Sequence, residues 1–236
     1  MPAVILQCRA ATEASQRERL EQGMAQGLQQ DLTGFAGSRV VITGGLGFIG
    51  SALAARLVGL GAKVLLIDSL APNYGGNLFN IETIRDRIEV AIVDIRETQR
   101  LKPLLEGCDH LFNLAGQTSH LDSMHDPVTD LEINSLAQLT LLEACRAICP
   151  GATIVFASTR QIYGRPLYLP VDEKHPLHRV DVNGINKMAG EAYHTLYHEV
   201  YGLKATSLRL TNTYGPRMRI KDARQTFVGV WLRAVL

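Results

Sequence analysis

VVITGGLGFIG, residues 40–50, decides the fold of this chain. An apolar β-branched run enters a glycine-rich turn, and an apolar helical pattern leaves it. Glycines at positions 44, 47 and 50 allow a tight turn, let backbone N–H groups approach a pyrophosphate, and bring helix close to strand. The positive end of the following helix favours phosphate charge. The stretch therefore predicts a dinucleotide site.

The next apolar run supports this prediction against the alternative of a glycine turn without a ligand. Residues 63–67 form a second predicted strand, and it ends at Asp68, about 20 residues after the glycines. A carboxylate at that point can bind the hydroxyls of an adenosine ribose.

Composition excludes several classes of partner. The chain has 236 residues, 46% of them hydrophobic and 20% charged, which is typical of one large α/β domain or a domain plus a fragment. A net charge of +1 predicts no binding to nucleic acid or to an anionic membrane. No apolar run approaches the roughly 18 residues of a membrane span. Residues 1–9 are too short and too polar for a signal peptide.

The cysteines indicate a reducing, cytoplasmic location. Cys8, Cys108, Cys145 and Cys149 have neither the spacing of a metal site nor that of a secreted disulfide framework. Cys145 and Cys149 lie one helical turn apart and are expected to pack as small apolar residues. No metal site is predicted.

From residue 38 onward, strand and helix patterns alternate. Apolar runs predict strands at 39–43, 63–67, 88–93, 109–114, 152–157 and 204–209, and helical patterns lie at about 48–60, 97–106, 130–148 and 184–202. Continuous rather than alternating apolar runs are typical of strands covered on both faces. The pattern predicts an α/β fold with a doubly wound parallel sheet, the Rossmann fold.

The ends of the chain differ from this middle. We expect residues 1–37 to be an N-terminal helical extension, with a weakly amphipathic helix over 10–33. The alternative is a solvated leader or an early start codon, with Met24 as the true start. Residues 38–210 form the predicted Rossmann domain, and 211–236 the beginning of an incomplete substrate domain that ends in a helical pattern from 226.

Ligands of such sheets lie at the carboxyl ends of the strands, so the residues just after each strand are candidates for binding. Asp94 and Ile95 come after the third strand, where the acid can reach an adenine amino group or act as a helix N-cap. Leu114, Ala115 and Gly116 come after the fourth and are small enough for a cofactor to approach the backbone.

Polar residues lie beyond these positions. His120, after Ser119, either binds substrate or transfers a proton, or is merely solvated. Asn134 is expected to hydrogen-bond neighbouring loops. After the fifth strand, Ser158 and Thr159 can hydrogen-bond a reacting alcohol or carbonyl oxygen. Lys187 faces solvent unless it reaches a ribose or a neighbouring group.

Together these motifs resemble the extended short-chain dehydrogenase/reductase family, which includes the NAD-dependent nucleotide-sugar epimerases and dehydratases. The resemblance runs from about residue 38 to the last residue, in the expected order. It rests on residues 43–50, Asp68, Asp94, residues 114–116, Ser158 and Thr159 with Tyr163-Gly164, residues 187–191 and residues 209–216.

The resemblance implies roles for individual residues. It assigns cofactor binding to Gly44, Gly47, Phe48, Ile49, Gly50, Asp68, Asp94, Ile95, Leu114, Ala115, Gly116 and Lys187. Thr159 takes the place of the catalytic Ser/Thr, and Asn212 that of an asparagine at the substrate's diphosphate. Ser119 and His120 are expected to bind substrate. No Arg or Lys closely follows Asp68, so NAD is predicted rather than NADP.

Two positions depart from the family pattern. Asn183 stands four residues before Lys187, where the family has its catalytic tyrosine. An amide cannot remove a hydroxyl proton, a step that typically contributes 10²–10⁴-fold to the rate. Either His120, Tyr168 or Asp181 substitutes, or the chain binds nucleotide without ordinary turnover. Secondly, Arg160-Gln161 replaces the acid pair of the 4,6-dehydratases, which favours an epimerase or another redox-neutral reaction over that dehydratase class.

We therefore expect an enzyme of the nucleotide-sugar epimerase type, in which bound NAD transiently oxidises a sugar and reduces it again. The alternatives are a non-catalytic NAD-binding relative and an N-terminal fragment of an epimerase or dehydratase. The expected ligand is a nucleotide sugar. The resemblance alone implies a homodimer, formed through a four-helix interface of residues 130–148 and 184–202.

Overall fold

A computed structural model of the protein describes residues 32–72, 74–219 and 227–235. The chain divides into two compact units, Met1–Ala36 and Gly37–Leu236. Of the first unit, the described part contains a short 3-10 helix, Leu32–Phe35. The helix predicted over 10–33 lies almost entirely outside the described residues. All features described below belong to the second unit.

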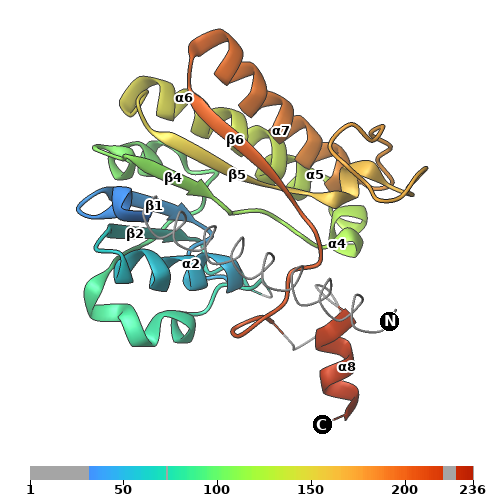
Figure 1. Ribbon diagram of the computed structural model, residues 1–236, viewed down its shortest axis with the longest axis horizontal. Helices are drawn as coiled ribbons and strands as arrows, with labels where there is room; N and C mark the ends of the chain where they lie inside the picture. Colours follow the sequence, from blue (N-terminus) through green and yellow to red (C-terminus); the bar gives the residue numbers. More distant parts are fainter. Residues whose placement is uncertain (1–31, 73, 220–226, 236) are drawn as a thin grey trace, which may run out of the picture. The chain divides into compact units, whose positions relative to one another are not determined.

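The second unit is built on a parallel six-stranded sheet (Figure 1). Its strand order is β3-β2-β1-β4-β5-β6. The strands are β1 (Arg39–Thr43), β2 (Lys63–Asp68), β3 (Glu89–Ile92), β4 (His110–Asn113), β5 (Thr153–Thr159) and β6 (Lys204–Leu210). The prediction of a doubly wound parallel sheet is therefore confirmed, and each predicted strand end is correct to within two residues.

The order of the strands reverses between β1 and β4. Both strands leave the sheet at the same level, because Thr43 is paired with Ile67 of β2 on one side and with Asn113 of β4 on the other. The loops after β1 and β4 then diverge toward opposite faces. Such a switch point leaves a crevice at the carboxyl edge of a parallel sheet, which is where ligands bind.

The helices cover both faces of the sheet. They are α2 (Phe48–Gly59), α3 (Thr98–Leu101), α4 (His120–His125), α5 (Pro127–Leu131), α6 (Ala137–Ile148), α7 (Val182–Tyr201) and α8 (Phe227–Val235). Shorter 3-10 segments are η2 (Leu78–Arg87), η3 (Lys102–Leu105) and η5 (Arg160–Tyr163), and η4 (Glu132–Leu136) is a π-helical turn. Among the described residues, no helix is long and apolar enough to cross a membrane.

Two predicted helices are subdivided. The pattern over 130–148 corresponds to the end of α5, the π turn and α6. The pattern over 97–106 changes from α to 3-10 geometry at Lys102–Leu105, where Pro103 cannot donate a backbone hydrogen bond. The sequence did not predict α4, which has only six residues, or η2, whose 3-10 turns lack the 3.6-residue period of an α-helix.

The core has two layers, one on each face of the sheet. On one face, alternate residues of the central strands, among them Val41, Leu65, Leu111 and Ile154, pack against α3, α6 and α7, whose Leu141 and Tyr197 are also buried there. Cys145 and Cys149 are buried in this layer as free thiols, as predicted. On the other face, Val40, Ile42 and Leu66 are buried opposite α2, whose Ala54 and Leu57 are also buried. Figure 1 shows α2 apart from α6 and α7.

The packing of α2 against the glycine-rich turn can be tested at Gly50. A Cβ there would press against the carbonyl oxygen of Gly44 and lie 2.8 Å from Cα of Gly45. We expect Gly50→Ala to lower the free energy of unfolding by about 1–3 kcal/mol, as for an overpacked core. The measurement is urea unfolding.

Gly59→Ala is the matched control, because Gly59 is the last residue of the same helix and a Cβ there meets nothing within 4 Å. We expect it to leave stability unchanged or slightly higher. Equal stability of the two variants would contradict the proposed close packing of turn and helix.

Candidate active site

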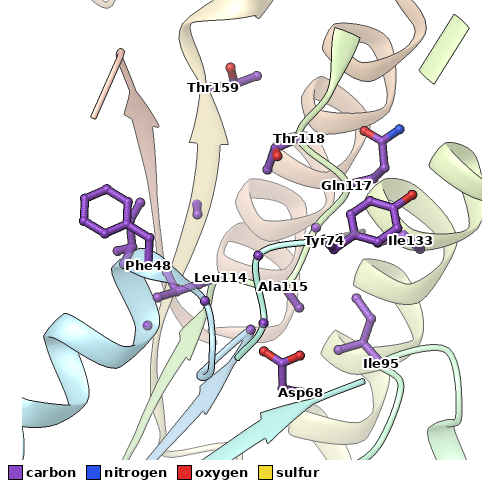
Figure 2. A pocket seen from close by; sticks show the side chains of 18 of the residues that line it. Phe48, Asp68, Tyr74, Ile95, Leu114, Ala115, Gln117, Thr118, Ile133 and Thr159 are labelled. Carbon is purple, nitrogen blue, oxygen red and sulfur yellow. The ribbon is translucent and has the colours of Figure 1, made fainter. Parts of the chain in front are cut away.

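A cavity of about 400 Å³ lies at the carboxyl edge of the sheet, within the size range of ligand sites (Figure 2). The loops after all six strands line it. In Figure 2, Asp68 lies at one end of the cavity and Thr159 at the other, and Leu114 and Ala115 lie between them. All predicted cofactor-binding and catalytic residues line this one cavity.

The floor of the cavity is a contact between two backbones. Gly44 has a φ of +67°, which favours glycine. A Cβ on Gly44 would lie 2.9 Å from the amide nitrogen of Ala115. The loops after β1 and β4 therefore touch without side chains between them, and any larger residue at position 44 would separate them.

The glycine-rich turn ends at the N-terminus of α2. The first bond within this helix runs from the N–H of Ser51 to the carbonyl of Gly47, at 3.0 Å. The N–H groups of Phe48, Ile49 and Gly50 precede that bond and have no acceptor within the helix. All three residues line the cavity. These N–H groups and the helix dipole make this end an anion site that fits a pyrophosphate.

Asp68 forms the wall beside this anion site. Its carboxylate accepts hydrogen bonds from the N–H of Leu46 at 3.0 Å and of Leu70 at 2.9 Å. Burial raises the pKa of Asp68 above its ordinary value, and the two N–H groups oppose this rise. A Cβ on Gly76 would lie 2.7 Å from Asp68 Oδ1, so the next loop also approaches the carboxylate closely. These features fit ribose hydroxyls and disfavour a 2′-phosphate.

Asp94 lines the cavity after β3 and forms an ion pair. Arg96 donates to its carboxylate at 2.8 and 3.1 Å and also binds Glu132 at 2.9 Å. Burial acts to raise the pKa of Asp94, but the hydrogen bonds from Arg96 hold it below its ordinary value. The N-cap position of α3 belongs to Glu97, so the N-cap alternative for Asp94 is wrong. Ile95 lines the same side (Figure 2).

Thr159 ends β5 at the opposite end of the cavity. Its hydroxyl oxygen accepts a hydrogen bond from the N–H of Gln161 at 3.2 Å and so caps the short helix η5. The side chain projects into the cavity (Figure 2). Its O–H group donates a long hydrogen bond to Gln161 Oε1 at 3.4 Å, which a ligand oxygen could replace.

Lys187 is buried in the wall near Thr159, so it does not face solvent. Its ammonium donates to the carbonyl of Ala157 at 3.0 Å, and a Cβ on Gly116 would lie 2.6 Å from Nζ. Burial lowers the pKa of Lys187 to about 8, and the nearby Asp130 carboxylate opposes this shift. The lysine therefore reaches the cavity at the bare backbone of Gly116.

Asn183, at the position of the family's tyrosine, belongs to a buried network around Asp130. Its amide donates to the carbonyl of Gln117 at 2.7 Å and to Asp130 Oδ2 at 3.0 Å. Asn134 donates to the same two acceptors at 2.9 and 3.0 Å, and Asn186 donates to Asp130 Oδ1 at 2.8 Å. Three amides thus surround one buried carboxylate. The donating end of Asn183 is turned toward the protein interior.

The network includes an irregular turn of helix. Asn134 lies in the π turn, a geometry that often occurs at functional sites. Its Oδ1 is buried without a hydrogen-bond partner among the described residues. Both this oxygen and Lys187 Nζ lie within 3 Å of the point where a side chain on Gly116 would begin. The expected bonding of Asn134 to a neighbouring loop is confirmed by its contact with Gln117.

The predicted substrate-binding residues are only partly brought together. Asn212 lines the cavity and accepts a long hydrogen bond from Arg160 at 3.4 Å. Ser119 and His120 do not line it. The hydroxyl of Ser119 caps α4, and His120 Nδ1 lies 2.8 Å from a carboxylate oxygen of Asp181. Substrate binding by these two residues stays a prediction.

The candidate substitutes for the missing tyrosine form hydrogen bonds with other residues and do not line the cavity. His120 is held by Asp181, which also caps α7. Tyr168 donates its O–H to Asp172 at 2.7 Å. None of His120, Tyr168 and Asp181 lines the cavity.

Sequence analysis did not predict several residues that line the cavity. Most of them lie further along the loops after β2 and β4 than the residues that directly follow each strand. Their position in loops at the carboxyl edge of the sheet is the signal that could have identified them. These residues are Tyr74, Gly75, Gly76, Gln117, Thr118, Thr129, Ile133 and Arg219.

Comparison with known proteins agrees with this geometry. Residues 40–236 match the model of the NAD dependent epimerase/dehydratase family, and the chain belongs to this family. The family resemblance of the sequence is thereby confirmed. NAD is the cofactor, and the glycine-rich turn, the N-terminus of α2 and Asp68 fit it.

Three proteins illustrate the similarity. UDP-glucose 4-epimerase of Mycolicibacterium smegmatis is 32% identical over 76% of this chain. UDP-glucuronic acid decarboxylase 1 of Arabidopsis thaliana is 31% identical over 79%. The structure of Thermus thermophilus UDP-glucose 4-epimerase in complex with NAD is 36% identical, with a TM-score of 0.71, and the match covers 83% of this chain and 60% of that one. The chain spans about half the length of the curated relatives, 57% of the Mycolicibacterium protein and 42% of the Arabidopsis protein.

The buried lysine predicts a pH dependence of stability. The pKa of Lys187 is about 8 in the folded protein and 10.5 for an ordinary lysine. The unfolded chain therefore holds this proton more firmly, so Lys187 costs stability below pH 8, and the cost disappears as the pH rises from 8 to 10.5. We expect Lys187→Met to be about 1–3 kcal/mol more stable at pH 7, since one pKa unit corresponds to about 1.4 kcal/mol.

Denaturant unfolding between pH 7 and pH 10.5 measures this effect. The stability advantage of Lys187→Met should shrink as the pH rises. Lys204→Met is the control, because Lys204 is exposed on β6, and its curve should run parallel to that of the native chain. A parallel curve for Lys187→Met would contradict the prediction.

Proposed function

We propose that this chain acts as an NAD-dependent enzyme of the nucleotide-sugar epimerase type. The observation that carries the proposal is that Thr159 and Lys187 share one cavity with the anion site and Asp68. When bound, NAD would supply the redox chemistry, in which a hydride leaves a sugar carbon and is later returned to it. The chain's own residues would orient the two reactants and stabilise the charge that develops during the reaction.

Thr159 and Lys187 would act at the reacting sugar oxygen and its surroundings. The threonine hydroxyl can donate a hydrogen bond to that oxygen when it becomes a carbonyl. Lys187, whose pKa is about 8, is mostly protonated at neutral pH, so its ammonium favours negative charge in this buried position. By the family pattern it also holds the nicotinamide ribose.

The names of the relatives support a nucleotide sugar as substrate, and they include neutral and acidic sugars. Arg160 and Gln161 stand where the 4,6-dehydratases carry an acid pair. Neither side chain can donate a proton to a leaving hydroxyl as a carboxylic acid does. This supports a redox-neutral epimerisation rather than elimination of water.

A non-catalytic NAD-binding protein is the second candidate. Asn183 favours it, because its amide donates to Asp130 and Gln117 and cannot replace the phenolate of a tyrosine as base. The two candidates agree on NAD binding and differ on turnover.

Cofactor choice is tested by thermal unfolding with NAD and NADP. We expect NAD to raise the melting temperature and NADP to raise it less, because a 2′-phosphate would face the Asp68 carboxylate. Asp68→Asn should weaken NAD binding about 10- to 100-fold, the effect of losing hydrogen bonds to a charged group. Asp86→Asn, an exposed residue outside the cavity, is the control. No response to NAD would refute the proposed cofactor site.

Turnover is tested by adding nucleotide sugars to the NAD-loaded chain and following the absorbance of NADH. We expect a transient signal with the true substrate, together with interconversion of two sugar epimers by chromatography. Lys187→Met should abolish this signal. Mass spectrometry of the denatured protein would identify any nucleotide sugar retained during purification. NAD binding without any reaction would favour the non-catalytic candidate.

We also propose a homodimer through α6 and α7, as the family resemblance implies. Ile185, Leu196 and Val200 expose apolar side chains on α7 at helical spacing, which supports this surface. Light scattering should show that Leu196→Glu with Val200→Glu lowers the molar mass to that of a monomer. Phe79→Glu, on η2, is the control and should leave the mass unchanged. A native chain that is already monomeric would refute the proposal.

A further inference from the structure

Arg160 is a cation at the cavity that has no acidic partner in the described part of the chain. It comes directly after Thr159, begins η5 and lines the cavity. Its one side-chain contact among the described residues is the hydrogen bond to Asn212 Oδ1, at 3.4 Å. Arg96 and Arg209, in contrast, bind carboxylates at close range. One contact leaves most of the five guanidinium N–H groups of Arg160 available to a ligand.

The carboxylates that line the cavity all lie on one side of it. Asp68 and Asp94 lie after β2 and β3, near one edge of the sheet, and they flank the expected adenosine site. Arg96, which is paired with Asp94, and Arg219, which donates to the carbonyl of Tyr74 at 3.1 Å, also lie on this side. Arg160 and Lys187 lie at the end of β5, toward the other edge. Among the described lining residues, no Asp or Glu belongs to this second group. The half of the cavity beyond the cofactor site is therefore cationic.

Gln161, the neighbour of Arg160, also indicates that this part of the cavity accepts a negatively charged group. Gln161 also lines the cavity, and its side-chain oxygen lies 3.4 Å from the hydroxyl of Thr159. An acid at either position would repel an anion held beside Thr159. Arg160 and Gln161 instead present a cation and a neutral amide, so this segment favours a ligand group with negative charge.

We propose that Arg160 recognises a carboxylate on the sugar, so that the substrate is a nucleotide-linked uronic acid. This rests on the proposed function. Consecutive Cα atoms are only about 3.8 Å apart, so Arg160 begins beside the residue that would hold the reacting sugar oxygen. A guanidinium binds a carboxylate through two parallel hydrogen bonds. Asn212, whose side-chain oxygen accepts only a long hydrogen bond from Arg160 at 3.4 Å, remains for the diphosphate.

The proposal is tested with UDP-glucuronate and UDP-glucose, which differ only in a carboxylate in place of a hydroxymethyl group. Calorimetric titration of the NAD-saturated 236-residue chain gives both dissociation constants. We expect UDP-glucuronate to bind at least about tenfold more tightly, as a charged hydrogen bond implies. Arg160→Gln should remove this preference and leave UDP-glucose affinity within about twofold. Arg160→Lys should retain part of it.

Arg165→Gln is the matched control, because Arg165 is exposed, is close in sequence and does not line the cavity. It should retain the preference. Melting temperatures of the variants in the absence of ligand show whether each remains folded.

Three results would overturn the proposal. Equal binding of the two sugars by the native chain would show that the carboxylate is not recognised, and it would leave the proposed function intact. An equal loss of UDP-glucuronate, UDP-glucose and UDP binding in Arg160→Gln would assign the arginine to the diphosphate. If NAD binds but neither sugar does, the proposed nucleotide-sugar function fails as well.

Discussion

The site depends on the close approach of the loops after β1 and β4. The hydroxyl of Thr43, the last residue of β1, donates to Asn113 at 2.9 Å and accepts from the N–H of Ala115 at 3.1 Å. These bonds fix the point at which the two loops separate, and Gly44 lets their backbones touch there. Burial of Thr43 and Asn113 makes each bond costly to lose, because an unpaired buried polar group keeps its full desolvation penalty.

Asp68 is tied to the same region. Its bond to the N–H of Leu46 joins the end of β2 to the glycine-rich turn, so the carboxylate proposed to bind ribose and the anion site are positioned as a unit. Desolvation opposes the charged form of Asp68, and a ligand that offers further donors would favour it. The cofactor end of the cavity is therefore organised before any ligand arrives, which reduces the entropy cost of binding.

How much of this could be predicted depends on the range of each signal. The strands, the glycine-rich turn and the place of Asp68 at the end of β2 were predicted correctly because local patterns of apolar residues and glycines encode them. The hydrogen-bond partner of Asn183 was not predicted, because Asp130 lies 53 residues away and no local pattern links the two residues. For the same reason the sequence could not place His120, whose bond to Asp181 spans 61 residues.

Because Asn183 is held in the network around Asp130 and cannot act as a base, turnover depends on another group near Thr159 that can accept a proton. In the lining near Thr159, Lys187 is a titratable group with a pKa close to neutral, and at a pKa of about 8 only about a tenth of it is neutral at pH 7. A sugar carboxylate bound nearby would raise that pKa and reduce the neutral fraction further. The positive charge of Arg160 would offset this effect by pairing with the carboxylate. In a site without the tyrosine, a cation next to Thr159 would therefore both bind an acidic sugar and preserve a nearby group able to accept a proton.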